Sequence, residues 1–216
     1  LYLFTKSHWL FYLYTNIILS KIINIIKKPG FKEMGIYIFT NFFGKAASFL
    51  LLFIYTNPLY ISPSENGLLS LMSNALMFFG YFISLGALHS VSTDFFKLDR
   101  ENFRNFFTTS FILPVTVTLL SILLLYIFRN ELQQQYGFPF MFTWLIPVLA
   151  FFTYCSEHLI TLVRSNNEPN RYLGVVLTRT VLELGLSLLL VVVFAWRWEG
   201  RVAGIFIAFS FSALYS

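Results

Sequence analysis

The sequence predicts an all-α integral membrane protein with about six transmembrane helices. Only 12% of its 216 residues are charged and 57% are hydrophobic, whereas about a quarter of the residues in a soluble domain are charged. Apolar runs of roughly 20 residues, the length that a helix needs to cross a bilayer, alternate with short polar stretches. Residues 31–216 are therefore expected to form one transmembrane helical lobe. The expected spans are residues 36–59, 67–88, 106–128, 140–163, 172–196 and 202–216, the last one incomplete.

The first 30 residues precede these spans. Residues 1–16 are hydrophobic but interrupted by a lysine and a histidine, and they lack a signal-peptide cleavage site. We expect them to be an N-terminal extension of uncertain relation to the native protein. In residues 17–30, isoleucines recur at helical spacing opposite polar residues, and Pro29-Gly30 follows. This pattern predicts a basic amphipathic helix at the membrane surface. It equally suits a simple cytoplasmic lead-in to the first span.

One charged residue interrupts the first span. Lys45 lies near its middle, where a lysine costs about 2.5–3.5 kcal/mol on insertion scales. It is therefore expected to face a polar interior of the helix bundle or a wet cavity. A turn that contains Pro58, Pro63 and Gly67 leads to the second span, which carries no charge. The polar stretch of residues 89–104 is expected to be a solvated loop.

The later spans contain helix-breaking residues and are joined by short turns. Pro114 predicts a kink in the third span, and Pro147 lies inside the fourth. Residues 129–137 and 164–171 are expected to be polar turns. The sixth apolar run has about 15 residues, fewer than a full crossing needs. We therefore expect the chain to end within its sixth helix and to be a fragment.

The distribution of lysine and arginine predicts an orientation. Basic residues gather before the first span and in the loops after the second and fourth spans, while the opposite loops contain few. The positive-inside rule places the N-terminus and these loops in the cytoplasm. Trp144, Trp196 and Trp198 then lie at the outer interface, where an aromatic belt is expected.

Four segments between the spans resemble a known family. They are YISPSENGLLSL before the second span, LGALHSVSTDFFKLDRENF after it, RSNNEPNRY between the fourth and fifth, and WRWEGRVAG before the sixth. Over roughly residues 17–216 the chain resembles the oligosaccharide flippases of bacterial polysaccharide biosynthesis. These flippases belong to the multidrug/oligosaccharidyl-lipid/polysaccharide exporter superfamily, which also contains the multidrug and toxin extrusion transporters.

The resemblance implies the N-terminal lobe of a two-lobed transporter in the bacterial cytoplasmic (inner) membrane. Such a transporter moves a polyprenyl-pyrophosphate-linked oligosaccharide, as used for lipopolysaccharide, between leaflets by alternating access, with its site near the bilayer midplane. The implied partners are the lipid-linked oligosaccharide, membrane lipids and a C-terminal lobe of the same protein.

Ionisable residues inside the spans are the candidate functional groups. Lys45 and Arg179 are cations that would offset the desolvation of an anionic pyrophosphate, and the arginine fork suits phosphate oxygens. Arg179 and Glu183 are four residues apart on one helix face, so they either line the cavity or neutralise each other in a structural ion pair. Lys45 alternatively snorkels to the surface, or pairs with Glu157 or Glu183.

Two carboxylates are candidates for binding a coupling ion. Glu157 and Glu183 are expected in apolar surroundings, where a carboxylate takes up a proton more readily. His158, next to Glu157, is expected to be an ordinary interfacial residue near the membrane surface.

The sequence does not favour an enzyme. It contains no GxSxG, HExxH or Walker A motif and no cluster of metal-ligating residues, so neither a metal nor a cofactor is expected. The basic residues fall at span ends, which favours a role in membrane orientation over nucleic-acid binding. Cys155 is the single cysteine, so no internal disulfide can form.

Three other functions remain open. One is a cation-coupled multidrug exporter of the same superfamily, which would be expected to bury a carboxylate in its first spans. Another is a membrane-embedded transferase or polymerase of polysaccharide synthesis, with His158 or Arg179 in its active site; such an enzyme usually has a large outer loop. The third is an inactive gene remnant.

Overall fold

Every regular element in the described part of the chain is a helix. The computed structural model describes residues 29–214, so the predictions for residues 1–28 lie outside it. Five helical stretches are long and apolar enough to cross a membrane, and α10, which overlaps the predicted sixth span, is not among them. The described helices agree with the predicted all-α, multi-pass membrane protein. The elements are α2 (Pro29–Tyr55), α3 (Pro63–Ser84), α4 (Ala87–Asp94), α5 (Arg100–Thr109), α6 (Ile112–Ile127), α7 (Arg129–Tyr136), α8 (Phe142–Ser165), α9 (Pro169–Leu188), the π-helical turn η1 (Leu189–Val193) and α10 (Arg197–Leu214).

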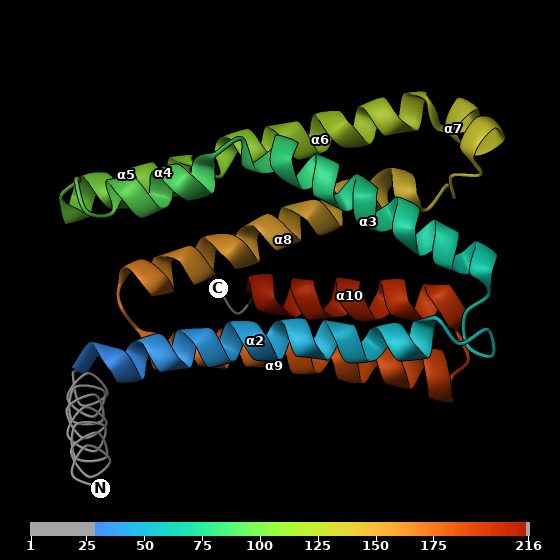
Figure 1. Ribbon diagram of the computed structural model, residues 1–216. Helices are drawn as coiled ribbons and strands as arrows, with labels where there is room; N and C mark the ends of the chain where they lie inside the picture. The colour runs from blue at the N-terminus through green and yellow to red at the C-terminus, as the bar shows by residue number, and fades with distance from the viewer. Residues whose placement is uncertain (1–28, 215–216) are drawn as a thin grey trace, which may run out of the picture.

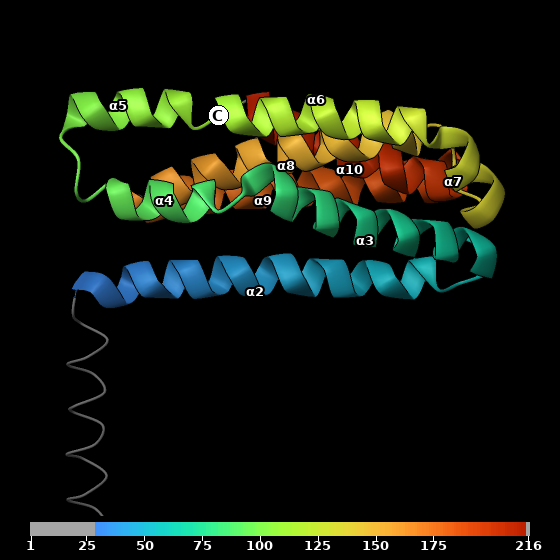
Figure 2. The ribbon, with the colours of Figure 1, turned by 90° about the horizontal axis from the view of Figure 1, so that it is seen from above.

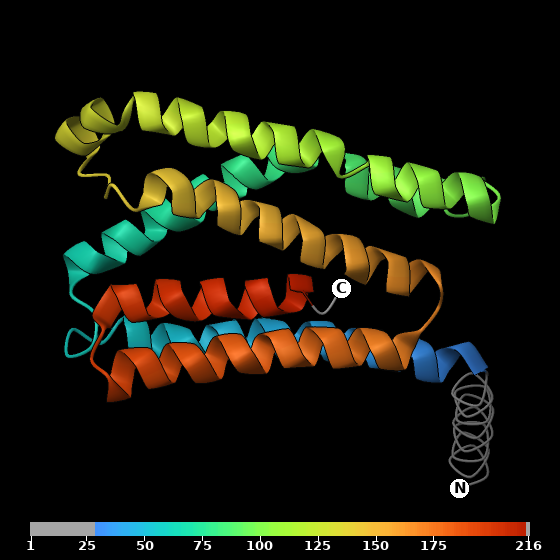
Figure 3. The ribbon, with the colours of Figure 1, turned by 180° about the vertical axis from the view of Figure 1, so that it is seen from behind.

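The long helices form two layers (Figure 1). One contains α3, α6 and α8, and the other contains α2, α9 and α10. Viewed from above, α2 follows one edge of the bundle, and α5 and α6 follow the opposite edge (Figure 2). Viewed from behind, α9 and α10 lie side by side (Figure 3). Helix α8 joins the layers, because it contacts both α3 and α10 and has more buried side chains than any other described helix.

The connections alternate between the two ends of the bundle. The start of α2, the α4–α5 turn and the α8–α9 turn lie at one end, and the α2–α3 and α9–α10 connections lie at the other (Figure 1). We call the first the basic end, because it carries Lys32, Lys97, Arg100, Arg104, Arg164 and Arg171. The opposite, tryptophan-rich end carries Trp144, Trp196 and Trp198.

Two helices begin earlier than the apolar pattern predicts. Pro29 and Gly30, expected to end a preceding helix, form the first turn of α2, because a proline fits the first turn, where its missing N–H needs no partner. Helix α3 begins at Pro63, four residues before the predicted Gly67. The Ser62 hydroxyl accepts the Glu65 N–H at 3.3 Å, and the Glu65 carboxylate accepts the Ser62 N–H at 2.6 Å. This capping box fixes the helix start.

The predicted polar loops are largely helical. Residues 89–104, expected to be a solvated loop, include most of α4 and the start of α5, and residues 129–137, expected to be a turn, contain all of α7. These segments contain leucine, glutamate, glutamine and arginine, which favour helix. A polar sequence excludes a segment from an apolar core, but it does not prevent the segment from forming a short helix.

The kink predicted at Pro114 is a break between α5 and α6 at Ser110 and Phe111. Pro114 has no N–H to donate to the carbonyl of Ser110, four residues earlier. The Tyr154 hydroxyl of α8 donates to that carbonyl instead, at 3.2 Å. A side chain of the neighbouring helix thus satisfies the carbonyl that the proline frees.

Helix α10 packs closely against the continuous helical stretch formed by α9 and η1. Small buried residues recur every four positions along α10: Gly200, Gly204, Ala208 and Ser212. A Cβ added at Gly204 would lie 2.9 Å from the Ser187 backbone nitrogen, and one at Gly200 would lie 3.0 Å from the carbonyl carbon of Leu190. Small residues therefore bring these two backbones together, as in tightly packed membrane helices.

Candidate functional site

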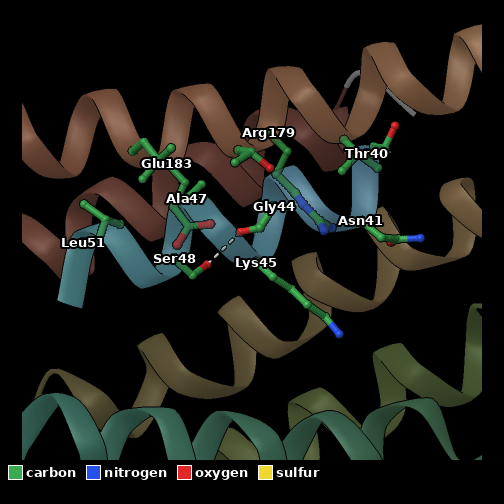
Figure 4. Close-up of a pocket in the computed structure, with 12 residues that line it drawn as sticks. Thr40, Asn41, Gly44, Lys45, Ala47, Ser48, Leu51, Arg179 and Glu183 are labelled. Carbon is green, nitrogen blue, oxygen red and sulfur yellow. Dashed lines mark hydrogen bonds between the residues drawn. The ribbon is translucent and has the colours of Figure 1, made fainter. Parts of the chain in front are cut away.

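A pocket of about 210 Å³ lies between α2 and α9. It brings together the three predicted cavity residues, Lys45 from α2 and Arg179 and Glu183 from α9 (Figure 4). At position 44, α2 lies against α9, because a Cβ added to this glycine would be in van der Waals contact with the Thr180 hydroxyl oxygen, at 3.8 Å. The polar residues lining this α2–α9 pocket are Thr40, Asn41, Lys45, Ser48, Arg179, Thr180 and Glu183.

Lys45 is the unpaired charge of this pocket. Its side chain is exposed and extends away from α9 (Figure 4). It makes no ion pair or hydrogen bond with another described residue. The alternative pairing with Glu157 or Glu183 is therefore wrong. An ammonium group without a partner can bind a ligand anion without first breaking an internal contact.

Arg179 pairs across helices rather than along its own. Its guanidinium lies 2.9 Å from the Glu157 carboxylate of α8 and donates to the Ser156 hydroxyl at 3.0 Å. It also lies 5.1 Å from the ring centre of Phe209 on α10. The predicted Arg179–Glu183 ion pair is wrong, because Arg179 reaches α8 and leaves Glu183 to another cation.

The partner of Glu183 is Arg201 in the second turn of α10, at 2.7 Å. The Arg201 guanidinium also donates to the Ser187 hydroxyl at 2.9 Å and lies 5.2 Å from the ring centre of Tyr55. Sequence reasoning assigned Arg201 to an outer loop, because the predicted sixth span began one residue later. The small residues at positions 200 and 204 could have indicated a helix that already packs closely here.

The two ion pairs join α8, α9 and α10. The exposed fractions of the side chains are 18% for Arg179 and 16% for Arg201, against 40% for Glu157 and 21% for Glu183. Removing charges from water is costly, so a pair at this depth is stable when further polar contacts satisfy its remaining donors and acceptors. The serine hydroxyls beside each guanidinium supply such contacts. The Ser156 hydroxyl in turn lies 2.7 Å from that of Ser212.

Glu183 also lines a second pocket. This space, of about 300 Å³, lies among α3, α8 and α10 and is otherwise mainly apolar, with Met72, Leu149 and Phe209 in its wall. Glu183 therefore stands between the polar α2–α9 pocket and an apolar neighbour.

His158 is fully buried, so its predicted interfacial position is wrong. Its ring centre lies 4.4 Å from that of Phe107 and 4.7 Å from that of Phe111. Its Nε2 is 3.0 Å from the Ser110 hydroxyl oxygen. Together with Tyr154 it holds the α5–α6 break against α8. His158 is thus a packing residue of the kink and does not line the α2–α9 pocket.

No known protein family, curated protein or solved structure matches the chain. In residues 29–214 no group of three or more His, Cys, Asp and Glu side chains is arranged to hold a metal ion. The site is therefore described by its own chemistry. It is a polar pocket inside candidate membrane spans, with one unpaired cation and two arginines held by carboxylates.

Proposed function

We propose that the chain is the N-terminal lobe of a flippase that carries a polyprenyl-pyrophosphate-linked oligosaccharide across the bacterial cytoplasmic membrane, with the basic end in the cytoplasm. The supporting observation is the unpaired Lys45 ammonium beside a polar pocket between two candidate membrane spans. A cation at this depth is costly unless it has polar surroundings or an anionic partner. A pyrophosphate head group would provide that partner.

The arrangement of charges favours an anionic cargo over a cationic drug. Both carboxylates proposed for ion coupling, Glu157 and Glu183, are engaged by arginines. Proton uptake at either residue would remove an interhelical ion pair. A cation exporter would instead be expected to keep a free carboxylate in its pocket, whereas the free charge near this one is positive.

An enzyme of polysaccharide synthesis has less support. His158 and Arg179 were its candidate active-site residues, but His158 is buried among aromatic rings and Arg179 is held by Glu157 and Ser156. They lie in different environments and do not form one reactive group. We therefore propose transport and not catalysis.

Binding of a pyrophosphate lipid tests the proposal directly. The chain would be reconstituted in lipid nanodiscs and titrated with farnesyl pyrophosphate, with uncharged farnesol as the control ligand. We expect farnesyl pyrophosphate to bind in preference, because a charge-assisted hydrogen bond contributes about 1.5–3 kcal/mol. Lys45→Gln should then weaken its binding by roughly tenfold or more.

A matched variant separates the pocket from general surface charge. Lys97→Gln removes the same charge from an exposed site between α4 and α5, and it should leave binding within about twofold, because exposed charges are screened by salt. Equal affinity for farnesol, or equal losses in the two variants, would rule out a pyrophosphate site at Lys45.

A further inference from the structure

A third pocket, different in character from the two described above, lies at the basic end between α5 and α8. Its volume is about 620 Å³, and it lies outside the α2–α9 pocket. Three charged and three apolar residues form its wall: Arg100, Glu101, Phe103, Arg104, Phe107 and Leu162. The site described above uses none of them as a pocket residue.

The two arginines are available for a ligand. Arg100 and Arg104 are four residues apart, so they share one face of α5. Both are exposed, and neither guanidinium has an ion pair or hydrogen bond with another described residue. With Glu101 they give the wall a net charge of one positive unit. Paired guanidinium groups present forked N–H donors that match phosphate oxygens.

The length of the third candidate span places this pocket near the lipid headgroups. Residues Arg100–Ile127 form a stretch of 28 residues, which at 1.5 Å per residue is about 42 Å long. The hydrocarbon core of a bilayer is only about 30 Å thick. Because α5 continues in nearly the same direction as α6 (Figure 2), the polar start of α5 extends roughly 12 Å beyond the core if the apolar α6 lies within it and upright.

The apolar residues of the pocket lie beside the two arginines. Phe103 and Phe107 are half-buried on the face of α5 that carries the arginines, and Leu162 completes the wall from α8. A phosphate bound by Arg100 and Arg104 would thus have aromatic and aliphatic surface beside it. This combination of cations and apolar surface matches a phospholipid, whose phosphate is attached to acyl chains.

We propose that the α5–α8 pocket binds the headgroup phosphate of an anionic phospholipid, with Arg100 and Arg104 on the phosphate and the acyl chains against Phe103 and Phe107. Basic pockets between membrane helices at the cytoplasmic side are suited to such headgroups. The site does not depend on the proposed transport function. It would fix the depth of α5 and of the α5–α6 break in the bilayer.

Lipid titration of the purified, delipidated chain tests the site. Native mass spectrometry would follow the first bound molecule of phosphatidylglycerol or of phosphatidylcholine with the same acyl chains. We expect phosphatidylglycerol to be preferred by at least about fivefold, and Arg100→Gln with Arg104→Gln to weaken its binding about 25-fold, roughly fivefold for each arginine. Equal retention of the two lipids would overturn the proposal.

Two matched variants define what the arginines contribute. Lys32→Gln with Lys97→Gln removes two exposed charges from the same end outside the pocket, and should change binding by no more than about twofold. Arg100→Lys with Arg104→Lys keeps the charge but loses the forked donors, so we expect about a fivefold loss. Equal losses in the two glutamine pairs, or full binding by the lysine pair, would contradict the assignment.

A soluble phosphate is the alternative ligand for this pocket. Inorganic phosphate in large molar excess should not displace phosphatidylglycerol, because it cannot make the apolar contacts. Displacement would assign the pocket to a soluble phosphate and overturn its assignment to a lipid. Unchanged helical circular dichroism in each variant would show that the exposed substitutions have not unfolded the chain.

Discussion

Individual charged residues in this protein differ most in whether they have a partner. Arg179 and Arg201 are enclosed and each is held by a carboxylate from a neighbouring helix, whereas Lys45 has no partner among the described residues. The sequence could predict that Lys45 needs polar surroundings, because a lysine within an apolar span is costly. It could not predict which carboxylate each arginine contacts, because helix spacing describes neighbours along one helix only.

The Glu183–Arg201 pair should be important for stability. Glu183→Gln leaves the Arg201 guanidinium enclosed without a counter-charge, so we expect the free energy of unfolding in detergent micelles to fall by about 2–3 kcal/mol. Replacing both residues by leucine should restore much of this loss, because no unpaired charge remains.

An exposed ion pair provides the comparison. Arg171 and Glu168 have exposed fractions of 55% and 41%, so Arg171→Gln should change the free energy of unfolding by about 0.5 kcal/mol or less. If Glu183→Gln were as mild as Arg171→Gln, the pair would contribute nothing to holding α9 against α10.

The contact between Tyr154 and the Ser110 carbonyl should depend on Pro114. In the natural sequence, Tyr154→Phe removes the donor to a carbonyl that the proline has freed, so we expect a loss of about 1 kcal/mol. In a Pro114→Ala background the new N–H can donate to the same carbonyl, and the loss should be smaller. Thermal unfolding of the two single variants and the double variant measures this coupling. Additive effects would show that the hydroxyl and the proline act independently.

At the scale of helices, the sequence predicted which segments form long apolar helices better than where they begin. Periodicity and length indicated the long helices, because a bilayer demands about 20 apolar residues. Their starts depend on local contacts such as the Ser62–Glu65 capping box. The short polar helices α4, α5 and α7 were missed because they contribute little to the hydrophobic pattern.

The contact between α9 and α10 should be intolerant of any added side chain. Gly204→Ala places a methyl group within 2.9 Å of the Ser187 backbone nitrogen, so the helices must separate, and overpacking of this kind costs about 1–3 kcal/mol. Gly185→Ala on α9 is the matched control, because nothing lies within 4 Å of its added Cβ. It should be neutral or stabilising, since alanine favours helix. Equal melting temperatures for the two variants would exclude a tight contact at Gly204.

For the whole molecule, the alternation of the two bundle ends predicts a specific labelling pattern. In a Cys155→Ser background, single cysteines would replace Asn166 in the α8–α9 turn, Lys97 in the α4–α5 turn, and Leu59 in the α2–α3 connection. All three positions are exposed. A membrane-impermeant maleimide added to intact cells should modify the Leu59→Cys variant, and should reach the other two only after permeabilisation.

Each other labelling pattern has a definite meaning. Labelling of Asn166→Cys and Lys97→Cys in intact cells, with Leu59→Cys protected, would reverse the proposed orientation. Labelling of all three from one side would contradict an odd number of crossings between Leu59 and each of the other two positions. The sequence could predict this alternation from the distribution of lysine and arginine, although it could not place the α2–α9 pocket, which depends on contacts between distant segments.

The two walls of the α2–α9 pocket differ in how they are held. The ion pairs described above hold α9, and none of them involves α2. Ion pairs join α8, α9 and α10, and the close contact between Gly204 and Ser187 joins α9 to α10. Among the described residues no ion pair joins α2 to these three helices. Helix α2 is held by apolar clusters and by hydrogen bonds such as the one that the Tyr172 hydroxyl donates to Asn41. A bulky cargo of the proposed transporter is therefore expected to enter by displacing α2, while α8, α9 and α10 stay together.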